Sequence, residues 1–83
     1  MLVVKVDEAL WASNILPEGQ LERWRARDGQ EVGVGQALAE VRIEDALHEI
    51  LSPGRGMLIH DASVGEAVEP GSRLGWISPT TSN

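Results

Sequence analysis

Four residues close together in the stretch AEVRIEDALHEILSPGRG could do chemistry: Glu44, Asp45, His48 and Glu49. Hard cations such as Ca²⁺ and Mg²⁺ prefer carboxylate ligands, so the group is a candidate metal site. The stretch, however, has the pattern of a strand, a tight acidic turn and a second strand, and successive side chains of a strand point to opposite faces. Because that alternation keeps the four side chains from converging on one ion, we predict a solvent-exposed acidic turn and no metal site.

Residues suited to covalent or acid–base catalysis are scarce in the rest of the chain. The sequence contains no Cys, and its two histidines, His48 and His60, lack the spacing of a zinc-binding helix. The serines are scattered and suggest no partnership with a base and an orienting acid: Ser13, Ser52, Ser63, Ser72, Ser78 and Ser82. We therefore predict a module without catalytic residues, in which His60 has a half-buried packing role.

Size and charge restrict the partners. A chain of 83 residues allows one small domain, and 7 basic against 13 acidic residues give a net charge of -6. This charge disfavours nucleic acid and anionic lipid, which attract clustered Lys and Arg. No apolar run approaches the roughly 20 residues of a membrane helix, and the lack of Cys suits a reducing compartment. We expect a cytoplasmic chain with protein partners, no nucleic acid and no membrane.

Short segments between turn signals predict an all-β fold. Nine Gly and four Pro divide the chain into pieces of strand length. The predicted strands are Leu2 to Val6, Gln20 to Arg27, Ala37 to Ile43, Leu47 to Leu51, Met57 to Ala62 and Arg73 to Ile77. We also expect short bridges around Val32 and Val68, and Asp7 to Leu16 is compatible with a single helical turn.

An internal repeat supports this fold class more strongly than propensity does. The segments DGQEVGVGQALAEV and VGEAVEPGSRLGWI align at a constant offset of 36 residues. The matched pairs are Gly29 with Gly65, Val32 with Val68, Gly35 with Gly71, Leu38 with Leu74, and Val41 with Ile77. Matching glycines indicate matching turns, and matching apolar residues indicate matching core positions. We predict a flattened β-barrel or sandwich of two antiparallel sheets with pseudo-two-fold symmetry.

The repeat continues upstream and predicts which side chains are buried. At the same offset, Leu21, Trp24 and Ala26 match Met57, His60 and Ala62. The predicted core consists of Val4, Leu21, Trp24, Ala26, Val32, Leu38, Val41, Ala46, Ile50, Met57, Ala62, Val68, Leu74 and Ile77. Arg23, Arg25 and Arg27 alternate with core positions, so they are expected in solvent. A small basic stripe for an acidic partner is the functional alternative.

These patterns resemble the biotinyl and lipoyl carrier domains. The segment EGQLERWRARDGQEVGVGQALAEV is similar to the opening pattern of that family, and SPGRGMLIHDASVGEAVEPGSRLGWI to its closing pattern, including the Ser-Pro-x-x-Gly corner. The resemblance covers Glu18 to Ile77. One departure is the segment from Gly56 to Gly65, which is one residue shorter than usual in the family and implies a tightened turn or a lost bulge.

The second departure lies in the hairpin that carries the modified lysine of the family. Lipoyl domains have Asp-Lys-Ala at this turn, and the resemblance places Glu44, Asp45 and Ala46 at these positions. An aspartate has no amine to form an amide with lipoate or biotin, and Lys5, the single lysine of the chain, lies outside the hairpin. Glu44 and Asp45, followed by Ala46, are compatible with a type I turn.

The resemblance therefore implies a carrier fold without its cofactor. We expect a single domain over residues 1–77 and a flexible tail over residues 78–83. The expected function is that of an unmodified protein-binding or structural module related to 2-oxo acid dehydrogenase complexes, with dehydrogenase components or a lipoyl or biotinyl ligase as partners. The alternative is a genuine lipoyl or biotinyl carrier that uses Lys5 or another acceptor.

Overall fold

Eight strands and one short 3₁₀ helix form the part of the chain that the computed structural model describes, residues 1–11 and 18–79. The elements are β1 Leu2–Lys5, η1 Glu8–Trp11, β2 Gly19–Trp24, β3 Glu31–Val32, β4 Ala37–Ile43, β5 Ala46–Leu51, β6 Gly56–His60, β7 Ala67–Val68 and β8 Arg73–Ser78. Ser78, which we expected in the tail, is thus the last residue of β8. The described part holds no helix of the length and hydropathy needed to cross a membrane. Residues 12–16 of the segment expected to hold a helical turn lie outside the described residues, and η1 supplies that turn just before them.

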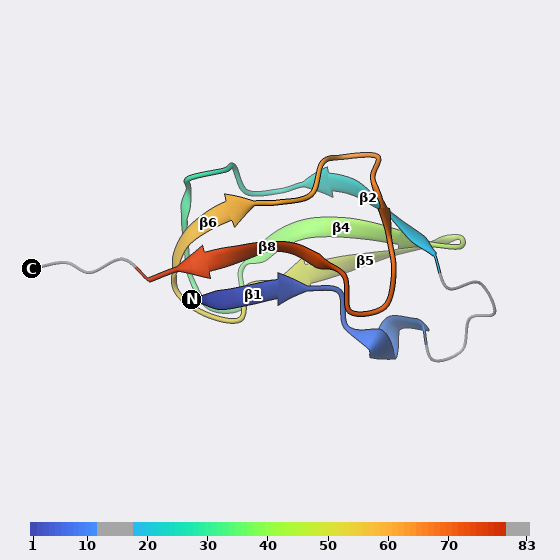
Figure 1. Ribbon diagram of the computed structural model, residues 1–83, viewed down its shortest axis with the longest axis horizontal. Coiled ribbons are helices and arrows are strands. Elements are labelled where there is room, and N and C mark those ends of the chain that lie inside the picture. The colour runs from blue at the N-terminus through green and yellow to red at the C-terminus, as the bar shows by residue number, and fades with distance from the viewer. Residues whose placement is uncertain (12–17, 80–83) are drawn as a thin grey trace, which may run out of the picture.

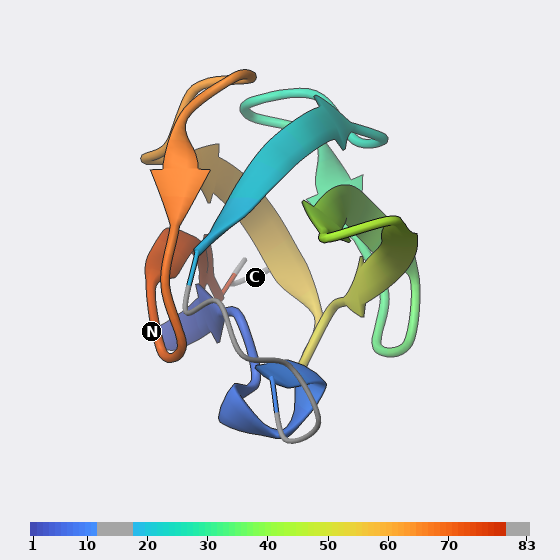
Figure 2. The same ribbon diagram turned by 90° about the vertical axis from the view of Figure 1, so that its right-hand side faces the viewer.

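The strands are arranged in two antiparallel sheets of four strands each. One sheet, here called the β1 sheet, has the order β1-β8-β6-β3, and the other, the β5 sheet, has the order β5-β4-β2-β7 (Figure 1). Seen end-on in Figure 2, the two sheets enclose a barrel-like space. The predicted sandwich of two antiparallel sheets is confirmed. Strands β1 and β5 each lie at the end of a sheet, which becomes important below.

The core lies between the sheets and is almost entirely aliphatic. It consists of Val4, Val6, Leu21, Ala26, Val32, Leu38, Ala39, Val41, Ile43, Ile50, Leu58, Ala62, Val68, Leu74 and Ile77. The prediction was wrong at Ala46, which is exposed, and at Met57, which is 40% exposed. Trp24 is only half-buried and packs against the core from its edge. Leu58, not Met57, supplies the buried side chain at the start of β6.

A β-bulge in the first half explains the error at Met57. Leu21 pairs with Val41, and at the equivalent place Leu58 pairs with Ile77. The register of β2 against β4 shifts just after Leu21, where Glu22 is the extra residue, whereas β6 pairs with β8 without a shift. A bulge adds one residue to one strand. Without it the second half is one residue shorter, so the residues before the bulge match the second half at an offset of 37 instead of 36. This is the lost bulge that the short segment implied.

The two halves meet at a stacked pair of rings, Trp24 and His60. Their centroids are 3.7 Å apart and their planes are 9° from parallel. The indole Nε1 donates to the carbonyl oxygen of Ala62 at 3.0 Å, and the imidazole Nε2 lies 2.9 Å from the carbonyl oxygen of Ala26. Because a carbonyl only accepts, Nε2 carries the proton. The contacts are reciprocal across the pseudo-two-fold axis, and the predicted packing role of His60 is confirmed.

The matched glycines adopt matched conformations. The φ angles of Gly29 and Gly65 are +85° and +92°, and those of Gly35 and Gly71 are +79° and +82°. These values lie where residues with a Cβ are strained, so the glycines of the repeat mark the same turns in both halves. The predicted turn equivalence is confirmed.

Candidate functional site

The β4–β5 turn is the candidate site. Ile43 pairs with Ala46, which leaves Glu44 and Asp45 as a two-residue turn with both side chains exposed. The hairpin projects from one end of the molecule, and the N-terminus and the end of β8 lie at the other end (Figure 1). The predicted place of the tip is confirmed, as is the predicted position of the N-terminus, while the C-terminal residues lie outside the described part of the chain.

The base of the turn is fixed to the body of the protein by Ile43, which is 1% exposed. A Cβ added to Gly19 would lie 2.9 Å from the carbonyl oxygen of Arg42 and 3.0 Å from Cγ1 of Ile43. Gly19 therefore lets β4 approach β2 closely at this point. Beside it, Arg42 Nε donates to Glu22 Oε1 at 2.7 Å on the outer face. The turn is thus exposed at its tip and rigidly anchored at its base.

The turn is not the type I turn with which its residues are compatible. Glu44, the first of the two central residues, has φ +55° and is the one non-glycine residue with positive φ in the described ranges. Type I turns have negative φ at both central positions, whereas the turns that best match strand twist have positive φ at the first. The twist of the two strands therefore sets the backbone conformation of the turn, although a glutamate disfavours positive φ.

Glu44→Gly is expected to stabilise the protein, because the steric cost of a left-handed residue, about 1–2 kcal/mol, exceeds the cost of the backbone freedom that glycine adds, about 0.5–1 kcal/mol. The matched control is Asp45→Gly, which adds backbone freedom at a residue without positive φ and is expected to cost about 0.5–1 kcal/mol. Urea unfolding of both variants measures the two effects. Equal changes in the free energy of unfolding would contradict the conformational difference between the two turn residues.

The other acidic and basic groups near the tip lie on different faces. Glu49 is opposite Glu40, on the outer face of the β5 sheet, whereas His48 is opposite the buried Val41. Within the described residues, no three His, Asp or Glu side chains gather in a way that could hold an ion. The alternation along β5 therefore places His48 and Glu49 on opposite faces, while Glu44 and Asp45 lie in the turn before it.

Lys5, the other candidate acceptor, is in a different setting. It is exposed at the end of β1, opposite Arg73 on β8, and not in a turn. Lys5 therefore lies at the end of a strand and is not part of the projecting β4–β5 hairpin.

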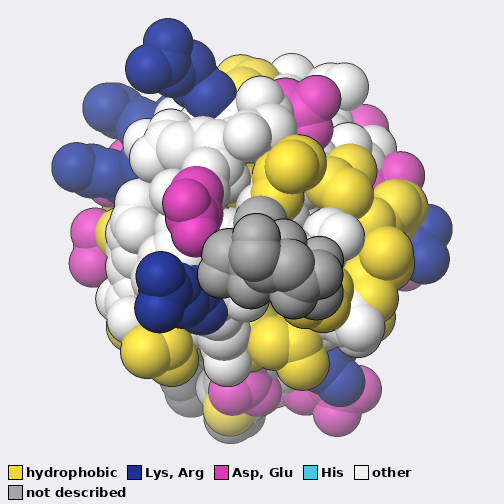
Figure 3. Space-filling model, turned by 90° about the vertical axis from the view of Figure 1, so that its left-hand side faces the viewer, with side chains coloured by type: hydrophobic (Ala, Val, Ile, Leu, Met, Phe, Trp, Pro, Cys, Tyr) yellow, Lys and Arg dark blue, Asp and Glu magenta, His cyan; other side chains and the backbone are white. Residues whose placement is uncertain are grey.

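The arginine stripe is exposed, as predicted, but most of it is paired. Glu40 accepts from Arg23 Nε at 2.8 Å and from Arg25 Nη1 at 3.2 Å. At the end of the molecule opposite the tip, most of the Lys and Arg side chains in view lie on one side and most of the hydrophobic side chains on the other (Figure 3). At the 36-residue offset Arg23 is matched by Ile59, which lies opposite Trp76, whereas Arg25 and Arg27 are matched by Asp61 and Ser63. The two outer faces of this symmetric fold thus have different chemistry.

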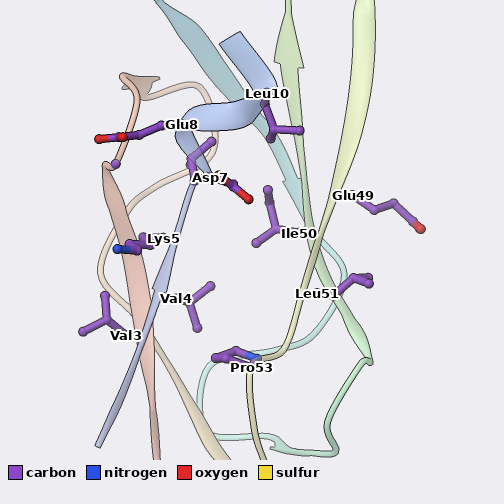
Figure 4. Close-up of a pocket in the computed structure, with 12 residues that line it drawn as sticks. Val3, Val4, Lys5, Asp7, Glu8, Leu10, Glu49, Ile50, Leu51 and Pro53 are labelled. Atoms are coloured by element: carbon purple, nitrogen blue, oxygen red, sulfur yellow. The ribbon is translucent and has the colours of Figure 1, made fainter. Parts of the chain in front are cut away.

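A groove between β1 and β5 was not predicted. It has a volume of about 590 Å³ and is bordered by residues of β1, η1 and β5 and by Pro53 (Figure 4). The sequence predicted the strand Leu47 to Leu51. It gave no indication that this strand ends a sheet, because strand order is not a local property of the sequence.

Comparison with known proteins identifies the architecture. No family model and no curated protein sequence matches the chain. Among solved structures, the lipoyl domain of the 2-oxoglutarate dehydrogenase complex from Azotobacter vinelandii superimposes with a TM-score of 0.72 over 94% of this chain and 99% of that one. The chain has the lipoyl-domain fold. Because only 16% of the aligned residues are identical, this similarity shows the fold alone.

Proposed function

We propose that this chain is an unmodified lipoyl-like module that acts by binding proteins. The observation that carries the proposal is Asp45 at the exposed tip of the β4–β5 turn, where the resemblance places the modified lysine of the family. Amide formation with lipoate or biotin requires a nucleophilic amine, and a carboxylate would give only a labile anhydride. The single lysine, Lys5, is on β1.

The proposed partners are proteins that read a carrier hairpin, namely components of 2-oxo acid dehydrogenase complexes or a lipoyl or biotinyl ligase, in the cytoplasm. Support comes from the preserved fold and from a tip that is exposed yet anchored by Ile43. The tip carries Glu44 and Asp45 without an opposing cation in the turn. A partner that recognises it is expected to present Lys or Arg, because the attraction of opposite charges would assist association. We propose residues 1–77 as the domain and residues 78–83 as a tail.

The test is the intact mass of the protein after co-expression with lipoylating and biotinylating enzymes. We expect an unchanged mass and, in pull-downs, enrichment of dehydrogenase components or a ligase over an unrelated domain of similar size. A lipoyl or biotinyl mass increment would overturn the proposal. If that increment disappeared in Lys5→Arg, the chain would be a carrier that uses Lys5.

A further inference from the structure

Strand β5 ends its sheet with an unpaired edge. Among the described strands it pairs with β4 alone. In a two-residue hairpin the pair that closes the turn is hydrogen-bonded, and bonded and non-bonded pairs then alternate. Ile43 and Ala46 close the turn, so the N–H and C=O groups of Leu47, Glu49 and Leu51 point away from β4. These groups can receive another strand.

The edge of β5 lacks the features that usually prevent such pairing. Edge strands are commonly protected by Lys, Pro, a bulge or short length. β1, which ends the other sheet, is only four residues long, has Lys5 and shows a register shift before it. β5 has six residues without Lys or Pro, and the register shift in its pairing with β4 falls on the β4 side. Leu47 and Leu51 are 50% and 53% exposed.

The groove beside β5 offers a place for the side chains of an added strand. In Figure 4, Val4 and Ile50 point into the space between β1 and β5, Leu10 lies at one end of it and Pro53 at the other. Side chains of a strand alternate, so a strand added to β5 would direct every second side chain over this apolar floor. The remaining side chains would lie beside Leu47, Glu49 and Leu51 on the outer face.

The negative charge of Glu49 favours a cationic residue at the middle position of such a strand. The side chain of Glu49 is exposed and forms no ion pair or hydrogen bond with the described residues. Asp7 and Glu8 also border the groove, and the side chain of Lys5 points away from it in Figure 4. A cation opposite Glu49 would complete a cross-strand pair, since opposite charges across strands are stabilising and like charges are not.

From these observations we propose that the β5 edge binds an extended peptide segment of a partner protein by strand addition. The segment is about five residues long, with apolar residues opposite Leu47 and Leu51, Lys or Arg opposite Glu49, and apolar residues over the groove. This goes beyond the proposed function, because the site is the strand edge and not the turn. A second copy of the chain fits poorly, because an antiparallel pairing of Leu47 with Leu51 would place the two Glu49 carboxylates opposite each other.

The test titrates the ¹⁵N-labelled protein with an acetylated, amidated pentapeptide, Val-Val-Lys-Val-Val, and with Val-Val-Glu-Val-Val as the charge control. We expect saturable binding of the lysine peptide at concentrations up to about 1 mM. Its binding should slow hydrogen exchange at the amides of Leu47, Glu49 and Leu51. The amides of His48 and Ile50 already face β4 and should not change. Uniform changes along β5, or none, would overturn the proposal.

Glu49→Lys is expected to weaken binding of the lysine peptide about fivefold and to strengthen binding of the glutamate peptide about fivefold. Each change corresponds to a cross-strand charge pair of about 1 kcal/mol. Glu69→Lys is the matched control, because it makes the same change in net charge in the exposed turn before β8. An equal effect of both variants would overturn the pairing with Glu49. A peptide-free dimer that protects the same three amides would assign the edge to a second copy and also overturn the proposal. Asp45→Lys should leave peptide binding unchanged, so this test is separate from that of the proposed function.

Discussion

Asp45→Lys is expected to make the chain a substrate for lipoylation or biotinylation, from no modification to a measurable fraction of modified protein. The change places an ε-amine on a flexible stem at the tip of the turn. Asp45 is exposed, and the pairing of Ile43 with Ala46 holds the turn at the end of a projecting hairpin. Intact-mass analysis after co-expression with the modifying enzymes measures the result.

The control for this prediction is Glu69→Lys, which adds one lysine to another exposed turn. Modification of Asp45→Lys but not of Glu69→Lys would show that the enzymes read the hairpin. A folded but unmodified Asp45→Lys would show that the turn has lost more than its acceptor. The positive φ of Glu44 is then the first cause to test, with Glu44→Asp added to restore the Asp-Lys-Ala sequence of lipoyl domains.

The features that the sequence predicted well are those that repeat along the chain. The alternation of apolar residues and the glycines at an offset of 36 residues predicted the strands, the two sheets and the place of the turn. Each of these depends on neighbours in sequence, such as the conformation that Gly29 and Gly65 allow. Local patterns were sufficient because the two halves of the fold have the same turns and the same alternation of buried residues.

The features that the sequence did not predict depend on contacts between distant segments. The bulge at Glu22 exists only relative to β4, so the repeat alone placed Met57 where Leu58 belongs. The conformation of Glu44 is imposed by the twist of two strands, and glutamate gives no signal for it. The unpaired edge of β5 follows from strand order. These same features carry the candidate site and the proposed peptide edge.

Leu58→Ala is expected to be far more destabilising than Met57→Ala, although the residues are adjacent. Leu58 is fully buried, and removal of a buried leucine side chain costs about 2–5 kcal/mol. Met57 is 40% exposed, so its truncation should cost less than about 1 kcal/mol. In a domain of this size the difference corresponds to a melting temperature lower by roughly 10–20 °C for Leu58→Ala.

Thermal unfolding followed by circular dichroism measures both variants, and their spectra at low temperature check that each retains the β fold. The comparison tests the lost bulge directly, because an unbroken repeat would make Met57 the counterpart of Leu21 and bury it. With the bulge confined to β2, Leu58 faces Ile77 inside the sandwich and Met57 lies opposite Ser78. If Met57→Ala were the more destabilising change, Met57 and not Leu58 would point into the core. β6 would then match β2 at the unbroken offset of 36 residues, and the bulge would not be confined to β2.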